Sequence, residues 1–185
     1  MGKASRPRRG AKRARPAASG RRTIGAPTRP TTPAKTYTSK PVSVEFAGPS
    51  HRFQWADLEI LGIDHSEASY EGRVFLNNPK ADAKTPRTID HGYAGSFYIF
   101  GHGGCFGDVG HCEVNGHRDA YDFRDSHPLV PTRARVPVTD TLRQLAKTSS
   151  EVTITVVPVV TGATELCNTT DVFRFERMRF LTYNP

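Results

Sequence analysis

The chain has 185 residues and a formal net charge of +8, a length typical of one domain with room for an extension. Residues 1–40 hold twelve Lys and Arg and no Asp or Glu, which leaves residues 41–185 with fourteen basic and eighteen acidic residues, a net charge of −4. The basic character therefore belongs to the N-terminal segment. No apolar run approaches the roughly 20 residues that a membrane-spanning helix needs, so we expect no membrane span. Three cysteines are too few for a disulfide framework.

Residues 1–40 are dominated by Arg, Pro, Ala, Gly and Thr, with only Ile24 and Tyr37 as large apolar residues. Such a segment cannot bury enough surface to offset its chain entropy, so we predict a disordered basic arm. One interpretation is an arm that binds nucleic acid or another anionic partner without sequence specificity, and the other is a solubilising leader without a ligand. No apolar stretch typical of a signal peptide follows the basic start, so the expected location is cytoplasmic. The cations that define the arm are Arg8, Arg9, Lys12, Arg13, Arg15, Arg21 and Arg22.

From residue 41 onward, short runs of alternating apolar and polar residues predict β-strands separated by Gly- and Pro-containing loops. Pro158 predicts an edge or a bulge in its strand, and Thr139 is the expected N-cap of one helix of about two turns. Phe53 and Trp55 are expected in the core or in a hydrophobic cap. We predict an all-β fold for residues 41–185, an antiparallel β-sandwich or jelly-roll-like barrel with one short helix. The predicted strands are 42–46, 58–62, 70–78, 93–100, 134–139, 151–160 and 171–183.

A glycine-rich stretch directly follows the predicted strand 93–100 and carries two thiols and three imidazoles within sixteen residues. Thiolates and imidazoles are ligands that suit Cu(I) or Zn²⁺, which makes the stretch a candidate metal site. A disulfide between Cys105 and Cys112 is a second interpretation, and it requires an oxidising compartment. A glycine-rich turn with buried free cysteines is the third. The candidate metal ligands are His102, Cys105, His111, Cys112 and His117.

Several blocks resemble the C-terminal domain of plant polyphenol oxidases, the tyrosinase-like copper enzymes, over about residues 56–183. The sequence of 72–77 stands where that family has Phe-Asp-Val-Tyr-Val-Asn, and it keeps the ending but not the Phe-Asp start. The block 93–97, followed by His102, is similar to the family's Phe-Ala-Gly-Ser-Phe block, which also ends in a histidine. Residues 134–160 are similar to its strand, short helix and Val-Pro strand. The residues that carry the resemblance to the family's core motifs are Val74, Phe75, Asn77, Tyr93, Ala94, Gly95, Ser96 and Phe97.

The resemblance implies a β-sandwich that carries no copper itself and covers the entrance to a type-3 copper site in a different domain. The missing Phe-Asp start and the Cys-containing stretch after the shared histidine depart from the family and suggest a stand-alone, bacterial-style relative, whose expected partner is a tyrosinase-type oxidase. The family's copper domain presents six histidines on helices, whereas the seven histidines of this chain are scattered over predicted strands and loops. We therefore expect no catechol oxidation by this chain alone. A metal-binding or copper-delivery protein and an anion-binding protein are the alternatives.

Overall fold

The computed structural model describes residues 33–47, 53–102, 121, 129–162 and 169–183, which belong to one compact unit, Thr31–Pro185. No helix in these ranges is both long enough and apolar enough to cross a bilayer. The described elements are β1 (Tyr37–Thr38), β2 (Val42–Ser43), the 3-10 helix η1 (Glu45–Ala47), β3 (Trp55–Ile63), β4 (Ser69–Leu76), the 3-10 helix η2 (Ile89–His91), β5 (Tyr93–Ile99), β6 (Thr132–Pro137), α1 (Thr139–Leu145), β7 (Glu151–Val152), β8 (Ile154–Gly162) and β9 (Arg177–Tyr183).

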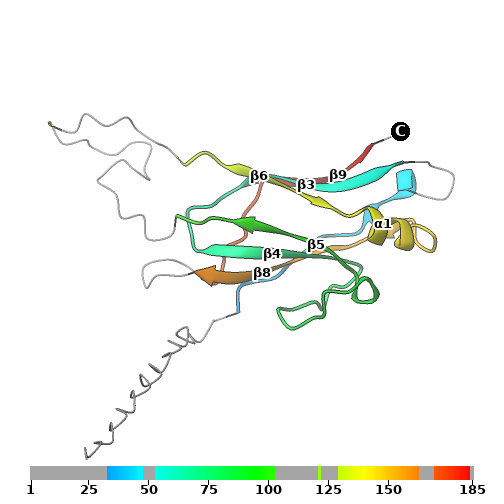
Figure 1. The fold of residues 1–185 in the computed structure, drawn as a ribbon, viewed down its shortest axis with the longest axis horizontal. Helices are drawn as coiled ribbons and strands as arrows, with labels where there is room; N and C mark the ends of the chain where they lie inside the picture. The colour runs from blue at the N-terminus through cyan, green and yellow to red at the C-terminus, as the bar shows by residue number, and fades with distance from the viewer. Residues whose placement is uncertain (1–32, 48–52, 103–120, 122–128, 163–168, 184–185) are drawn as a thin grey trace, which may run out of the picture. The chain divides into compact units, whose positions relative to one another are not determined.

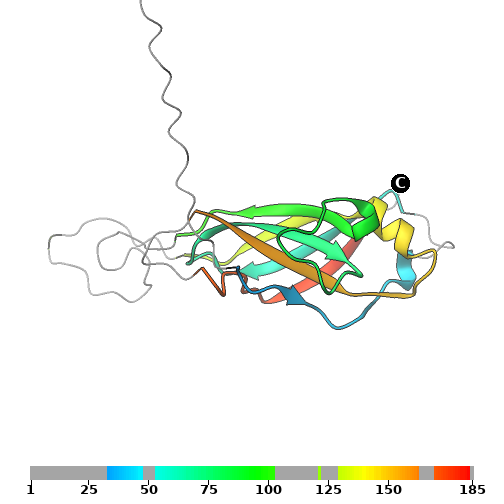
Figure 2. The same cartoon turned by 90° about the horizontal axis from the view of Figure 1, so that it is seen from below.

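The strands form a four-stranded sheet of order β1-β8-β4-β5, a three-stranded sheet of order β6-β3-β9, and a small β2-β7 pair. Every pairing of the described strands is antiparallel. Figure 1 shows the two larger sheets as two layers, and in Figure 2 the four-stranded sheet lies in front of the other. The predicted antiparallel β-sandwich with one short helix is therefore confirmed, and the described strands do not close into a barrel.

The core lies between the two sheets because alternate residues of each strand point inward. From β3, Ala56, Leu58 and Ile60 are fully buried, and from β4 the inward side chains include Tyr70 and Val74. A group of aromatic rings closes one part of this core: Phe173 contacts Tyr37, Tyr70, Phe97 and Phe175 with ring centroids 4.9–6.3 Å apart.

The folded unit begins before residue 41, so the predicted boundary at residue 40 is wrong by several residues. Tyr37 pairs with Val156 in β1, and its ring lies edge-on to Phe175 at 4.9 Å. The backbone N–H of Lys35 donates to the carbonyl of Thr170 at 2.6 Å. An aromatic ring and a strand pairing thus tie residues 35–38 to the sandwich. The arm cations from Arg8 to Arg22 lie outside the described residues.

The C-terminal strand is shorter than predicted. Strict alternation predicted a strand over 171–183, but β9 begins at Arg177. Gly62 has a left-handed φ of 66°, and a Cβ there would lie 2.6 Å from Cβ of Glu176, so β3 departs from regular pairing just after Leu61. In the segment before β9, the neighbouring residues Val172 and Phe173 are both buried, whereas a regular strand with alternating residues would expose one of the two.

Two further predictions at the ends of elements are corrected. The helix α1 forms as predicted, but Val138 is its N-cap, and the hydroxyl of Thr139 instead accepts the backbone N–H of Ala56 at 2.9 Å. This bond ties the helix to β3. Phe53 is buried as expected, whereas Trp55 is 53% exposed because the alternation of β3 places it on the outer face.

Pro158 lies at a free edge of its strand, as one of the two predicted alternatives for this proline requires. β1 pairs only with Thr155 and Val156, so the β1 side of β8 is free of strand pairing from Val157 onward in the described structure. A proline lacks the N–H that a paired neighbour would need, and it is tolerated at such an edge.

Candidate functional site

The two family-like blocks pair with each other as β4 and β5, with a register shift between Val74 and Phe75. Gly72 lies opposite Phe97, Arg73 opposite Ser96, and Val74 opposite Gly95. Asn77, at a left-handed φ of 55°, follows the ladder, and its side-chain oxygen accepts the backbone N–H of Thr153 at 2.8 Å, while its own N–H donates to the carbonyl of that residue at 2.9 Å. The blocks that carry the resemblance therefore build the frame that positions the end of β5.

The chain that leaves β5 is fastened to the connection between β3 and β4. The N–H of Gly101 donates to the hydroxyl of Ser69 at 3.0 Å, and the N–H of His102 donates to the carbonyl of His65 at 2.8 Å. A Cβ at Gly101 would lie 2.0 Å from the carbonyl oxygen of Glu67, so only glycine permits this approach. The backbone is thus anchored directly after Phe100.

Two imidazoles meet at this end of the sandwich. The rings of His65 and His102 lie edge to face with centroids 4.9 Å apart. Nε2 of His65 is 3.0 Å from the carbonyl oxygen of Val130, and because a carbonyl only accepts, this nitrogen carries the proton. Nδ1 of His102 is buried and has no hydrogen-bond partner in the described structure.

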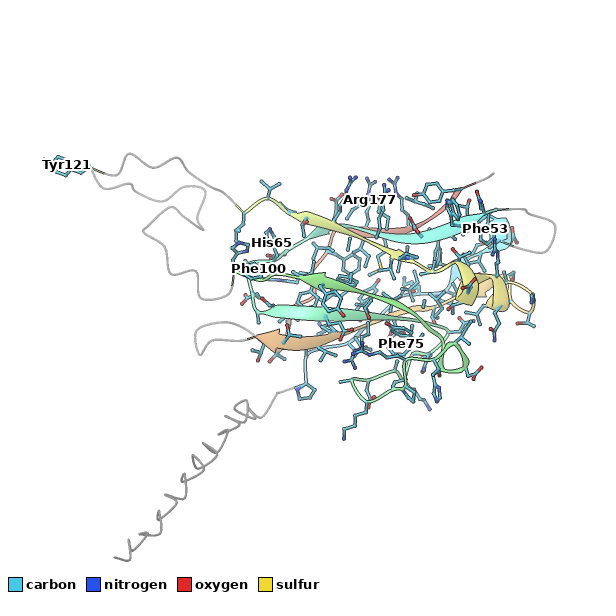
Figure 3. The ribbon with its side chains drawn as sticks, in the orientation of Figure 1. Phe53, His65, Phe75, Phe100, Tyr121 and Arg177 are labelled. Atoms are coloured by element: carbon cyan, nitrogen blue, oxygen red, sulfur yellow. The ribbon has the colours of Figure 1, made fainter. Side chains whose placement is uncertain are left out.

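Two exposed apolar residues lie next to the imidazole pair. Phe100 is 78% exposed and Val130 is 69% exposed, and the ring of Phe100 lies edge-on to His102 at 5.6 Å. Figure 3 shows Phe100 and His65 together at the same end of the sandwich. We call Phe100, Val130, His65 and His102 the β5 end. An exposed phenyl ring beside an anchored backbone is suited to fill a pocket of another protein.

An ionic cluster stabilises the connection behind the β5 end. Arg174 contacts the carboxylates of Asp64 at 2.9 Å and Glu67 at 3.4 Å, and the N–H of Ser66 donates to Asp64 at 2.9 Å. Burial alone would raise the pKa of Asp64, but the hydrogen bonds from Ser66 and the charge of Arg174 outweigh burial and lower it. The carboxylate of Asp64 therefore stays charged at neutral pH, and its contacts with Arg174 and Ser66 hold the β3–β4 connection in shape.

The outer face of β4 carries a second, fully satisfied polar network around Glu71, which is only 4% exposed. Its carboxylate accepts Arg73 at 3.0 Å, Arg87 at 2.9 Å and the hydroxyl of Ser96 at 2.9 Å, with the hydroxyl of Tyr98 at 3.4 Å. Burial raises its pKa, but these hydrogen bonds and the two arginine charges prevail and lower it. A carboxylate that stays ionised and has all its lone pairs occupied does not serve as a proton donor near neutrality.

The predicted metal ligands are only partly within the described structure. His102 lies at the β5 end, whereas Cys105, His111, Cys112 and His117 lie outside the described residues, as does the predicted disulfide between Cys105 and Cys112. No group of three His, Cys, Asp or Glu side chains in the described ranges is arranged to hold a metal ion. The structure instead places His65 beside His102. No sequence signal identifies His65, because the two histidines are 37 positions apart and meet only through the sandwich.

Comparisons with known proteins yielded solved structures only. A scan of protein-family models and a search of curated proteins returned no match. Latent aurone synthase (polyphenol oxidase) from natural source aligns with 80% of this chain and 24% of its own at 15% identity and a TM-score of 0.45. Recombinantly expressed latent aurone synthase (polyphenol oxidase) aligns with 82% of this chain and 24% of its own at 16% identity and a TM-score of 0.44. The chain spans about a quarter of the length of these proteins.

Proposed function

We propose that this chain is a non-catalytic accessory domain that docks on a tyrosinase-type, type-3 copper oxidase and covers the entrance to its active site. The observation that carries the proposal is Phe100, a phenyl ring 78% exposed on a turn that Gly101 and the His102–His65 hydrogen bond hold in place. An exposed aromatic ring on a rigid support loses little conformational entropy when it enters a pocket.

The position of this ring agrees with the resemblance found in the sequence. The block similar to Phe-Ala-Gly-Ser-Phe forms β5, and Phe100 and His102 follow directly. In the family that this chain resembles, the C-terminal domain shields a copper site that belongs to another domain. We therefore assign Phe100 to the contact with the oxidase, with Val130 as its apolar neighbour.

The test is co-purification from the native host, with mass-spectrometric identification of the captured proteins and an assay of diphenol oxidation. Tagged wild-type chain should capture a tyrosinase-type oxidase, and added chain should slow diphenol oxidation by that oxidase. Phe100→Asp should abolish both effects. Ile89→Asp, an exposed apolar residue on η2 beyond the other end of β5, is the matched control and should retain them. The proposal fails if no such oxidase is captured, or if the two variants behave alike.

Metal binding is a second candidate function because one observation favours it. The buried Nδ1 of His102 lacks a hydrogen-bond partner in the described structure, and a second imidazole, that of His65, lies beside it. Elemental analysis of reduced protein from metal-replete cells tests this function. A structural site binds strongly, so about one metal per chain is expected, with loss in His102→Ala and in His65→Ala. Less than about 0.1 metal per chain would rule out such a site.

A further inference from the structure

The outer face of the β6-β3-β9 sheet carries four arginines around one buried carboxylate. Alternation along the strands places Glu59 of β3, Arg133 and Arg135 of β6, and Arg177 and Arg179 of β9 on this face. We call these five residues the arginine face. Figure 3 shows Arg177 pointing away from the sandwich on this side. The face is distinct from the β5 end, so a partner bound here is independent of the proposed function.

Glu59 fixes the orientation of two of the arginines. Its carboxylate is 1% exposed, and Arg135 and Arg179 each approach one oxygen, with the closest contacts at 2.9 Å and 2.7 Å. Both guanidinium groups bring Nε and Nη2 to Glu59 and remain about half exposed. Two cations thus share one anion. Asp57 lies on the same side of β3 and its charge also acts on Arg135, so the four arginines of the face stand against two carboxylates and leave a net charge of +2. The hydrogen bond from Arg179, followed by that from Arg135, lowers the pKa of Glu59, which keeps the carboxylate ionised at neutral pH.

Arg133 and Arg177 add positive charge at the next outward-facing position along β6 and β9, two residues from Arg135 and Arg179. Arg177 lies opposite Leu61, and Arg133 precedes Arg135 by two residues on the other side of β3. Both are exposed, and neither forms an ion pair with the residues that the structure describes. Successive outward rows on a strand are about 6.7 Å apart, and β6 and β9 are about 9.5 Å apart across β3. Four guanidinium groups therefore occupy a compact, flat area.

The other side chains on this face identify the kind of partner. Trp55, 53% exposed, and Tyr183, directly opposite it, lie on the same side of the sheet as the arginines, and no outward position of the three strands is a lysine. Arg, Trp and Tyr are the residues that dominate protein–protein contacts, whereas Lys is depleted there. Charge complementarity requires carboxylates on the other side.

We propose that the arginine face docks a protein partner through a cluster of Asp and Glu side chains. Arg133 and Arg177 each donate two parallel hydrogen bonds to one carboxylate of the partner. Arg135 and Arg179, held in place by Glu59, offer the edges of their guanidinium groups that Glu59 leaves open. Trp55 packs against the apolar part of the same partner.

The experiment titrates the full chain with a fluorescein-labelled, glutamate-rich peptide of about twelve residues, which spans the face when extended. Fluorescence anisotropy gives the affinity, and Trp55, the single tryptophan of the chain, reports contact with the face through its emission. The basic arm is the same in every variant, so differences between variants isolate the folded surface.

The charge-neutralised pair Arg133→Gln/Arg177→Gln should bind the peptide at least fivefold more weakly and should lose the change in Trp55 emission. The matched pair Lys80→Gln/Lys147→Gln removes the same charge at exposed positions elsewhere and should change affinity less than twofold. Because all four side chains are exposed, both pairs should melt like the wild type.

Three outcomes would overturn the proposal. In one, both double variants lose the same affinity. In another, Trp55 emission does not respond to peptide that is bound. In the third, a single-stranded DNA oligonucleotide loses affinity in Arg133→Gln/Arg177→Gln by the same factor as the peptide, which would make the face a general anion surface.

Discussion

Gly72 in β4 lies directly under the ring of Phe97 in β5, and this contact allows a quantitative prediction. A Cβ at Gly72 would lie 2.3–2.8 Å from three carbons of that ring. Carbon atoms in contact are normally about 3.5–4.0 Å apart, so the ring would have to retreat by about 1 Å. It has little room to do so, because Phe97 is 5% exposed and packs against Tyr70 and Phe173.

Gly72→Ala should therefore destabilise the fold. Overpacking of this kind costs about 1–3 kcal/mol, and alanine recovers about 0.5–1 kcal/mol over glycine inside a strand. The expected net loss in free energy of unfolding is about 1–2 kcal/mol, or a fall in Tm of about 2–8 °C for a domain of this size.

Removing the ring should reverse the sign of the effect. Phe97→Ala costs about 3–5 kcal/mol by itself, because it empties a buried site. In that background the added methyl group of Gly72→Ala enters free space, and the substitution should stabilise by about 0.5–1 kcal/mol. The two substitutions should thus couple by about 1.5–3 kcal/mol.

Urea unfolding of the four proteins, followed by circular dichroism, measures this cycle, with an unchanged m-value as the check that each variant unfolds alike. Phe97→Leu replaces Phe97→Ala if the latter proves too unstable to give a folded baseline. Equal destabilisation by Gly72→Ala with and without the ring would show that the cost arises from the strand and not from the contact with Phe97.

Two further predictions concern polar anchors of the sandwich. Because the pKa of Glu71 is lowered in the folded state, its contribution to stability is complete well above pH 4.5 and is lost as the pH falls through that value toward the folded-state pKa. Glu71→Gln should therefore flatten the fall in the free energy of unfolding between about pH 5 and pH 3, whereas the control Glu45→Gln should not. The prediction fails if the free energy of unfolding falls equally steeply in wild type and Glu71→Gln over this pH range. Arg143 donates to the carbonyls of Phe53 and Gln54 at 2.7 Å and 2.8 Å and lies over the Phe53 ring at 5.0 Å. Arg143→Ala should therefore lower the free energy of unfolding in urea by about 1.5–3 kcal/mol, and Arg143→Lys should lower it less. A loss under about 0.5 kcal/mol in Arg143→Ala would contradict the stabilising role of these contacts.

The sequence predicted the strands well where apolar and polar residues alternate with the two-residue period of a β-strand. The runs at 70–78 and 93–100 also became β4 and β5, since their aromatic and aliphatic residues between polar loops match the composition of sheet strands. The edge position of Pro158 followed from its missing N–H. The predicted strand 171–183 was too long because the left-handed backbone at Gly62 ends the regular pairing of β3. Trp55 was expected to be buried, but a shift of one position along a strand moves a side chain from the core to the solvent-facing side.

The β5 end was predictable only in part. His102 stood out because it follows a family-like strand, and the fixed turn around Gly101 has a local cause in a glycine that meets a neighbouring carbonyl. The pairing of His102 with His65 depends on which strands become neighbours. Long-range proximity of this kind leaves no pattern in a single sequence, so His65 could not be identified before the sandwich was known.

The buried glutamates show how similar sequence signals lead to different surfaces. Glu59 and Glu71 each alternate with apolar neighbours on a central strand and would be assigned to solvent, yet both are almost completely covered by arginines. Glu71 also accepts two hydroxyl groups and lies on a face that the loop after β4 partly covers, where Ala81 packs on Phe75. Glu59 has only its two arginines, which face solvent on a sheet that no described element covers. A buried carboxylate therefore completes a closed network on one sheet and leaves oriented positive charge on the other, and this difference makes the arginine face the better candidate for binding a partner.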